Sequence, residues 1–243
     1  MALSDLGETA MKNLQIFRKL LPALPPVLGV LFIHTALGAA YIVPSASMQP
    51  TLKIGDEIIV SAPSYGLSTA SLPFGYAFAQ ITQKRIFGHL PHRGDIAVFR
   101  APANPHETWV KRVIGLPGDR IALMDGRILL NGKILPWKDK GPDQEENSRG
   151  HTYSAERYEE TLPDGIHHDI VKLTPHGPLD NVPEFTVPAE RLFVMGDNRD
   201  NSADSRVSVA EGGVGLLPIW NLQGRAITVL FSWESIKRIL VSI

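Results

Sequence analysis

The sequence contains no cysteine. Disulfide bonds, zinc–thiolate sites and catalysis by a cysteine nucleophile are therefore excluded in any compartment. The chain also lacks an excess of charge of one sign, because 24 Lys and Arg face 25 Asp and Glu, for a formal net charge of −1. Without a basic stretch there is no strong field to attract a polyanion, so we do not expect nucleic acid as a partner.

The eight histidines are scattered, and no metal-ligand spacing such as HExxH occurs. His167 and His168 are neighbours, and in a strand their side chains point to opposite faces, so they cannot share one site. We therefore expect each histidine at the surface, and we expect neither a metal ion nor a cofactor.

The sequence also contains only one long apolar run. Residues 27–43 read VLGVLFIHTALGAAYIV and are followed at once by Pro44. A helix needs about 20 apolar residues to cross the bilayer core, with about 17 as the lower limit, so this run predicts a transmembrane anchor. Two alternatives stay open: secretory cleavage after Ala40, and a helix buried in a globular core. The run is preceded by about 26 residues, which is long for a signal peptide and favours an uncleaved anchor.

Basic residues before the run predict its orientation. Lys12, Arg18 and Lys19 precede it, and by the positive-inside rule residues 1–26 lie in the cytoplasm. Residues 44–243 would then form a domain on the extracytoplasmic side of the inner (plasma) membrane, tied to the phospholipid surface by a single span.

The pattern after the run is that of a mostly β fold. With 21 Gly and 19 Pro, turns are frequent, which favours antiparallel sheet over a helical bundle. Asp125-Gly126 and Asn131-Gly132 stand between short apolar runs, a strong signal for tight hairpins. We expect an antiparallel β-sheet domain with long loops. Its expected strands are 57–60, 96–99, 109–114, 120–124, 127–130, 133–135, 153–161, 170–173, 191–195 and 226–233.

Two segments depart from this pattern. Residues 64–91 are rich in Phe, Tyr and Leu and contain no acidic residue. Two interpretations stay open for them: a hairpin packed on the domain, and an apolar insertion that faces the membrane. Residues 138–150 read KDKGPDQEENSRG, which is charged and poor in apolar residues and predicts a mobile surface loop.

Two serines follow the apolar run directly. The segment PSASMQPTL places Ser45 and Ser47 two residues apart, between Pro44 and Pro50. Such a serine is either a linker residue at the membrane edge or a nucleophile held at the bilayer surface. A serine hydroxyl is a poor nucleophile until a neighbouring base removes its proton, so the choice depends on whether the chain supplies a base.

Lys111 is the candidate base. It lies in the middle of an expected strand, and alternation places it on the same face as Trp109 and Val113. Burial on an apolar face lowers the pKa of a lysine and favours the neutral amine, which is able to act as a base. The alternative stays equally open, in which Arg112 is buried in an ion pair and Lys111 is solvated.

Four segments together resemble bacterial type I signal peptidase. They are PSASMQPTLKIGD (44–56), RGDIAVF (93–99), WVKRVIGLPGD (109–119) and GDNRDNSADSR (196–206). They occur in the order of that family and span most of the chain after the apolar run. The resemblance implies a membrane-anchored serine endopeptidase with a mostly β catalytic domain and a serine/lysine dyad.

The resemblance also implies roles for single residues. Ser47, directly before Met48, is similar to the family's nucleophile, and Lys111 is similar to its general base. Ser45 resembles the hydroxyl donor of the oxyanion hole, which acts beside the backbone N–H of Ser47. Ser202 resembles the serine that orients the lysine amine.

The family's support and substrate residues have counterparts too. Asp204 and Arg206 resemble an ion pair that braces the last segment, and shallow apolar pockets are expected near Val43 and Val110. By resemblance, the enzyme removes N-terminal signal peptides from exported preproteins after small residues at −1 and −3, through an acyl-enzyme. Residues 207–209 read VSV in place of the family's aromatic-Gly step. This difference affects the expected shape of this loop and not the expected dyad.

Two other functions stay open. One is a different serine/lysine peptidase, such as a processing enzyme with one dedicated substrate. The other is a membrane-tethered β domain that binds peptides without cutting them, a function that leaves Lys111 and Ser202 without a role.

Overall fold

The structure, a computed structural model, describes residues 18–19, 21–23, 25–26, 39–66, 68–71, 85–147 and 149–243. No helix within these residues is long and apolar enough to cross a membrane. Most of the predicted anchor, residues 27–38, lies outside the described residues. Its last part differs from the prediction, because Ala39–Ile42 form strand β1 and pair with strand β2 (Glu57–Ser61). The predicted helical boundary at residue 43 is therefore wrong.

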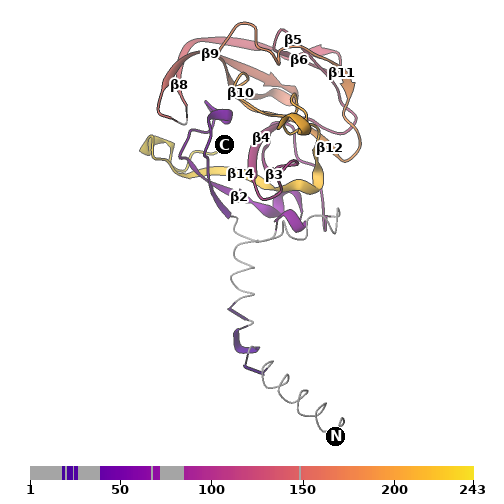
Figure 1. Ribbon diagram of the computed structural model, residues 1–243, viewed down its shortest axis with the longest axis vertical. Coiled ribbons are helices and arrows are strands. Elements are labelled where there is room, and N and C mark those ends of the chain that lie inside the picture. Colours follow the sequence, from indigo (N-terminus) through magenta and orange to yellow (C-terminus); the bar gives the residue numbers. More distant parts are fainter. Residues whose placement is uncertain are drawn as a thin grey trace.

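Seven antiparallel strands form the largest sheet, in the order β1-β2-β14-β3-β4-β12-β13. In Figure 1 its strands β2, β3 and β14 lie in the lower part of the domain. The remaining strands of this sheet are β3 (Ile96–Arg100), β4 (Thr108–Gly115), β12 (Arg191–Met195), β13 (Leu217–Pro218) and β14 (Leu222–Phe231). The prediction of a mostly β, antiparallel domain is confirmed.

Two smaller antiparallel sheets lie above the large one in Figure 1, with orders β10-β9-β8 and β11-β5-β6-β7. The first contains β8 (Trp137–Glu146), β9 (Thr152–Leu162) and β10 (Ile166–Lys172). The second contains β5 (Arg120–Met124), β6 (Arg127–Leu130), β7 (Lys133–Ile134) and β11 (Val182–Thr186). Residues 18–19 and 25–26 are α-helical. The other described helical elements are single 3₁₀ turns: η1 (Leu21–Ala23), η2 (Ala46–Met48), η3 (Ala62–Tyr65), η4 (Thr69–Ser71), η6 (Pro163–Gly165), η7 (Val209–Glu211), η8 (Ile219–Asn221) and η9 (Ile236–Arg238).

The two hairpins predicted from Asp-Gly and Asn-Gly pairs are confirmed. Strands β5, β6 and β7 pair in succession through these turns. All four turn residues have positive φ, between 49° at Asp125 and 80° at Gly132. This conformation is that of a two-residue type I′ turn, in which glycine and asparagine or aspartate are the least strained residues.

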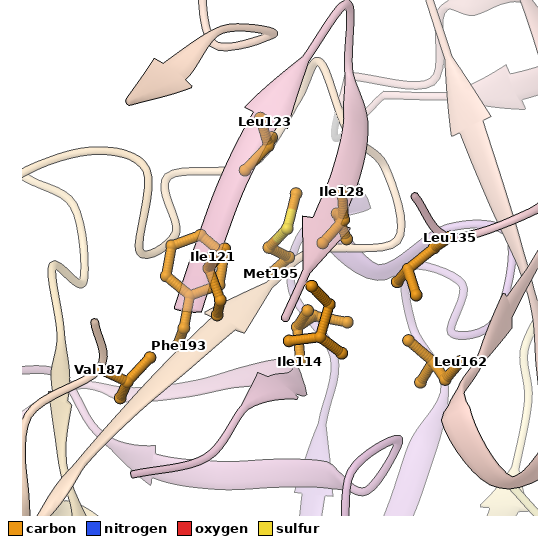
Figure 2. Packing of buried hydrophobic residues seen from close by; sticks show 10 residues of the cluster. Ile114, Ile121, Leu123, Ile128, Leu135, Leu162, Val187, Phe193 and Met195 are labelled. Atoms are coloured by element: carbon orange, nitrogen blue, oxygen red, sulfur yellow. The ribbon is translucent and has the colours of Figure 1, made fainter. Parts of the chain in front are cut away.

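Buried apolar side chains join the sheets. Figure 2 shows Ile121, Leu123 and Ile128 from β5 and β6 facing Phe193 and Met195 from β12. Two further clusters form around the large sheet, and β3 contributes alternate residues to each of them. Both faces of β3 are therefore covered, which explains why its sequence, IAVF, is continuously apolar.

The mobile loop predicted for residues 138–150 is wrong over most of its length. Residues 138–146 belong to strand β8, which pairs with β9 along its full length. Cross-strand ion pairs stabilise this segment: Lys140 lies 2.7 Å from Asp169, and Asp143 lies 3.2 Å from Arg157. Pairing between opposite charges takes the place of the apolar alternation that the sequence lacks here.

Residues 64–91 are described only in part. Arg85 donates hydrogen bonds to the carbonyl oxygens of Tyr65 and Gly66 at the start of the segment, at 2.9 and 2.6 Å, and to that of Leu222 in β14 at 2.8 Å. The aromatic residues between positions 72 and 84 lie outside the described residues. The described ends therefore dock on the domain, while the membrane-facing interpretation stays a prediction.

Replacement of Ile128 tests the packing in Figure 2. Ile128 is 0% exposed and Ile134, in the next strand, is 52% exposed. We expect Ile128→Ala to lower the free energy of unfolding by about 2–5 kcal/mol, because it opens a cavity. The matched change Ile134→Ala should cost less than about 1 kcal/mol. Denaturant unfolding followed by tryptophan fluorescence measures both, and equal losses would contradict this packing.

Candidate active site

Ser47 lies in the 3₁₀ turn η2, which the core holds in place. Met48 and Leu52 are fully buried in the cluster formed with β2, β3 and β14. The N–H of Leu52 donates to the carbonyl oxygen of Met48 at 2.9 Å. Ser47 itself is 8% exposed, and the burial of Met48 and Leu52 fixes the turn that carries it.

Lys111 reaches Ser47 from strand β4. Its Nζ donates to Ser47 Oγ at 2.7 Å and to the carbonyl oxygen of Val110 at 3.0 Å. The amine also lies 5.8 Å from the centre of the Trp109 ring. Because Lys111 is only 5% exposed, the solvated alternative for this residue is wrong.

The neighbouring Arg112 is buried as well, and it pairs with a different residue. Its Nε and Nη2 donate to the two carboxylate oxygens of Asp197 at 2.8 and 2.7 Å. Thr51 donates to the same carboxylate at 2.5 Å. The two interpretations of this strand thus combine: Arg112 forms a buried ion pair, and Lys111 contacts the serine.

Burial lowers the pKa of Lys111 to about 8. Loss of hydration is the largest cause, because the charged amine has no water around it. The carboxylates of Asp204 and Asp197 act in the opposite direction, and Arg206 lowers the pKa further. The amine is therefore much closer to neutrality at physiological pH than an ordinary lysine.

Ser45 and Ser202 are the two other serines that the sequence predicts for the site. The Oγ of Ser45, which is exposed, lies 3.3 Å from Ser47 Oγ, and either hydroxyl is able to donate. Ser202 is buried, and its Oγ has no hydrogen-bond partner among the described residues. A Cβ at Gly196 would lie 2.3 Å from Ser202 Oγ and 2.4 Å from the carbonyl oxygen of Ser47. Glycine at this position lets the Ser202 loop approach the Ser47 backbone.

Asp204 and Arg206 form a bidentate ion pair. The Nε and Nη2 of Arg206 donate to the Asp204 carboxylate at 2.9 and 2.8 Å. The same carboxylate accepts the N–H of Gly196 at 3.1 Å. Arg206 also donates to the carbonyl oxygen of Arg199 at 2.6 Å, so the pair ties both ends of the loop that carries Ser202.

A cleft of about 460 Å³ opens beside the Ser47–Lys111 contact. Val110 lines it, whereas Val43 is 2% exposed, packs in the core and is not among the lining residues. Val110 packs against the same apolar cluster that contains Val43, so the two residues share one cluster although only Val110 reaches the cleft. The lining consists of Pro44, Ser45, Ser47, Glu107, Thr108, Trp109, Val110, Lys111, Asn201 and Ala203.

The chain is similar to known signal peptidases over most of its length. A family model described as "Signal peptidase, peptidase S26" matches residues 16–232. A signal peptidase I from Pseudomonas fluorescens is 38% identical over 218 residues, which cover 88% of this chain and 72% of that protein. The chain belongs to the signal peptidase family, peptidase S26.

Two further similarities have lower sequence identity. A signal peptidase I from Rickettsia bellii (strain OSU 85-389) is 34% identical over 220 residues, which cover 86% of this chain and 73% of that protein. A crystal structure of a signal peptidase I from Enterococcus faecalis V583 is 25% identical and covers 56% of this chain and 97% of that chain, with a TM-score of 0.32. Membership of the peptidase S26 family makes the chain an enzyme, a serine peptidase.

Sequence reasoning missed a buried polar network near the Ser47–Lys111 contact of this signal peptidase family member. His168 is 7% exposed, so its predicted surface position is wrong; its Nε2 lies 3.3 Å from Glu160 and 3.9 Å from Asp197. Arg199 Nη2 lies 2.5 Å from Glu160. Loss of hydration and the nearby Arg112 lower the pKa of His168, against the opposing effect of Glu160 and Asp197. Arg112, Asp197 and Arg199 lie in the segments that resemble the family, whereas Glu160 and His168 do not.

Among the described residues, no group of three or more His, Asp or Glu side chains is arranged to hold a metal ion. The described site offers a serine hydroxyl, a lysine amine and the polar groups around them. This set suits acyl transfer, in which a nucleophile and a base within hydrogen-bond reach are the central requirement.

The buried amine predicts a specific dependence of stability on pH. Below pH 8 the amine is protonated in the folded and unfolded states alike, and its buried charge destabilises the fold. Between the folded pKa of about 8 and the ordinary value of 10.5, the unfolded chain binds the extra proton, so the free energy of unfolding rises with pH. We expect this rise to reach up to about 3 kcal/mol.

Lys111→Met should lack this rise, whereas Lys133→Met, at an exposed site, should keep it. Denaturant unfolding of the three proteins at several pH values between 7 and 10.5 measures the difference. Parallel curves for the wild type and Lys111→Met would show that the folded state does not depress this pKa.

Proposed function

We propose that this peptidase removes N-terminal signal peptides from exported preproteins, by cleavage after small residues at −1 and −3. The observation that carries the proposal is the 2.7 Å contact between the buried Lys111 amine and Ser47 Oγ, beside an open cleft. The membership of the chain in the signal peptidase family supplies the substrate class.

In the first step Lys111 accepts the proton of Ser47, and Oγ attacks the scissile carbonyl carbon. With a pKa of about 8, about one amine in ten is neutral at pH 7, compared with fewer than about one in a thousand for an ordinary lysine. The protonated amine then donates its proton to the leaving amine as the C–N bond breaks. Water, deprotonated by the same lysine, hydrolyses the ester and restores Ser47.

The developing oxyanion requires donors that are in place before the reaction. The backbone N–H of Ser47 and the hydroxyl of Ser45 are the proposed pair. The 3.3 Å separation of the two serine Oγ atoms supports this role, because it places the Ser45 hydroxyl beside the point of attack. Ser202 is proposed to orient the Lys111 amine, with its buried and unpartnered Oγ available for that contact.

The cleft gives the proposed substrate an apolar surface beside the dyad. Trp109 and Val110 line one side of it, and Pro44 and Ala203 also contribute. An extended peptide that enters beside strand β4 would obtain affinity from main-chain hydrogen bonds and selectivity from these side chains. Val110 is the proposed pocket residue, while the buried Val43 acts through the packing beneath the cleft.

A membrane location is part of the proposal. The apolar run before strand β1 is proposed to anchor the chain in the inner membrane by a single span, with the catalytic domain on the extracytoplasmic side. Ser47 follows the end of β1 by five residues, which would keep the nucleophile close to the phospholipid surface. The cleavage site of a signal peptide emerges from the bilayer at that surface.

Replacement of the dyad tests the proposed reaction directly. We expect Ser47→Ala and Lys111→Met to lower preprotein cleavage in detergent at least about 1000-fold, because each removes a group that the reaction cannot replace. The controls Ser154→Ala and Lys133→Met alter exposed side chains away from the dyad and should cleave normally. Retained cleavage by either dyad variant, with both variants folded, would refute the assignment.

The pH profile tests the role of Lys111 as the base. We expect kcat/KM to rise tenfold per pH unit below a midpoint near 8 and to level off above it, because only the neutral amine accepts the serine proton. A peptide substrate without groups that titrate between pH 6 and 9 isolates the enzyme's own ionisation. A rate that falls across pH 7–9 would point to a different base.

A further inference from the structure

The tip of the β8–β9 hairpin contacts the segment that carries Ser47. Gln49, two residues after Ser47, donates from Nε2 to the carbonyl oxygen of Glu146 at 2.9 Å. Lys53 donates from Nζ to the buried carboxylate of Glu145 at 2.6 Å. The hairpin belongs to one of the two upper sheets in Figure 1, so these contacts join a small sheet to the nucleophile segment.

Tyr153 connects this segment to the loop that follows β12. Its hydroxyl donates to Gln49 Oε1 at 3.0 Å and accepts a hydrogen bond from Asn198 Nδ2 at 3.0 Å. The N–H of Asn198 donates to the carbonyl oxygen of Ser47 at 3.2 Å. The result is a closed hydrogen-bonded ring that runs from Ser47 through Asn198, Tyr153 and Gln49 and returns along the chain.

The ring is buried and therefore stiff. Gln49 is 1% exposed and Asn198 is fully buried, with the Tyr153 ring half-buried between them. Water has little access to these polar groups, so loss of the Tyr153 hydroxyl leaves the Gln49 carbonyl and the Asn198 amide without their partner. The sheet that contains β8, β9 and β10 also contacts the loop after β12 at a second point. There Val171 of β10 exchanges backbone hydrogen bonds with Asp197 and Arg199.

We propose that Tyr153 is a positioning residue for the nucleophile. Its hydroxyl fixes the Ser47 backbone from both sides, through Gln49 and Asn198, and so sets the direction of the Ser47 Oγ and N–H. The proposal rests on Ser47 as the nucleophile of the proposed function. Tyr153 touches neither Ser47 nor Lys111 directly, so it acts on the precision of the site and not on its chemistry or its electrostatics.

The test replaces Tyr153 by phenylalanine in the full chain in detergent. We expect Tyr153→Phe to lower kcat for a signal-peptide substrate about tenfold with KM changed less than about twofold, because a small displacement of the nucleophile slows the chemical step more than it weakens binding. The pH midpoint of kcat/KM should stay where it is in the wild type, since Lys111 stays buried. The control Tyr158→Phe, on the same strand with its ring 5.0 Å from that of Trp137, should keep the wild-type kcat.

A second measurement does not depend on catalysis. In a Ser47→Ala background, Tyr153→Phe should speed amide hydrogen exchange about tenfold in residues 46–52 and 196–199, with the strands of the large sheet unchanged. This arm remains valid even if Ser47 proves not to be the nucleophile, so failure of the proposed function and failure of this inference are distinguishable. Unchanged exchange in these two segments would overturn the inference.

Glu145→Gln provides a second variant if Tyr153→Phe does not fold. It keeps the shape of the side chain and weakens the ion pair with Lys53, and we expect kcat to fall about threefold with the pH midpoint unchanged.

A kcat equal to that of the wild type in Tyr153→Phe would overturn the inference. So would a loss of kcat accompanied by faster exchange in every strand, because it would show a general loosening of the fold.

Discussion

The contact between the Lys111 amine and the Ser47 hydroxyl is the interaction on which the site depends. It joins residues 64 positions apart in the chain, so the fold has to fix two distant segments to within a fraction of an ångström. Strand β4 is held between β3 and β12, and η2 is held by the burial of Met48 and Leu52. Burial also lowers the pKa of the amine, so the packing that positions this amine also favours its neutral form.

Buried ion pairs surround this contact but do not touch the cleft. Arg112 with Asp197 and Arg199 with Glu160 are paired at 2.7 and 2.5 Å and are almost completely buried. Such pairs contribute little net stability, because dehydration offsets their attraction, but the loss of one partner is costly. Their effect here is geometric. In the first pair, Arg112 directly follows Lys111 in the chain. In the second pair, Arg199 holds the loop that leads to Ser202.

Sequence reasoning succeeded where short-range rules decide the structure and failed where distant residues do. The Asp-Gly and Asn-Gly hairpins followed from local turn geometry. Alternation alone did not separate Lys111 from Arg112, because both lie in a strand that is buried on both faces. Strand β8 was missed because its charges are paired by residues of β9 and β10, and buried His168 was missed because its neighbours come from other segments. The four sequence segments that resemble the family contain Ser47 and Lys111, which the structure brings into contact. The hairpin tip that contacts Gln49 and Lys53 left no local signal in the sequence.

The pair formed by Asp204 and Arg206 shows how a loop is braced beside a buried amine whose pKa stays low. A carboxylate alone at this position would raise the pKa of Lys111 and reverse part of the effect of burial. Asp204 raises the pKa of Lys111, and Arg206 lowers it and so opposes part of this larger effect. The two hydrogen bonds from Arg206 to the Asp204 carboxylate, at 2.8 and 2.9 Å, are charge-assisted and therefore strong, so they stabilise the loop. An ion pair therefore braces the loop and raises the pKa of the nearby lysine less than a lone carboxylate would.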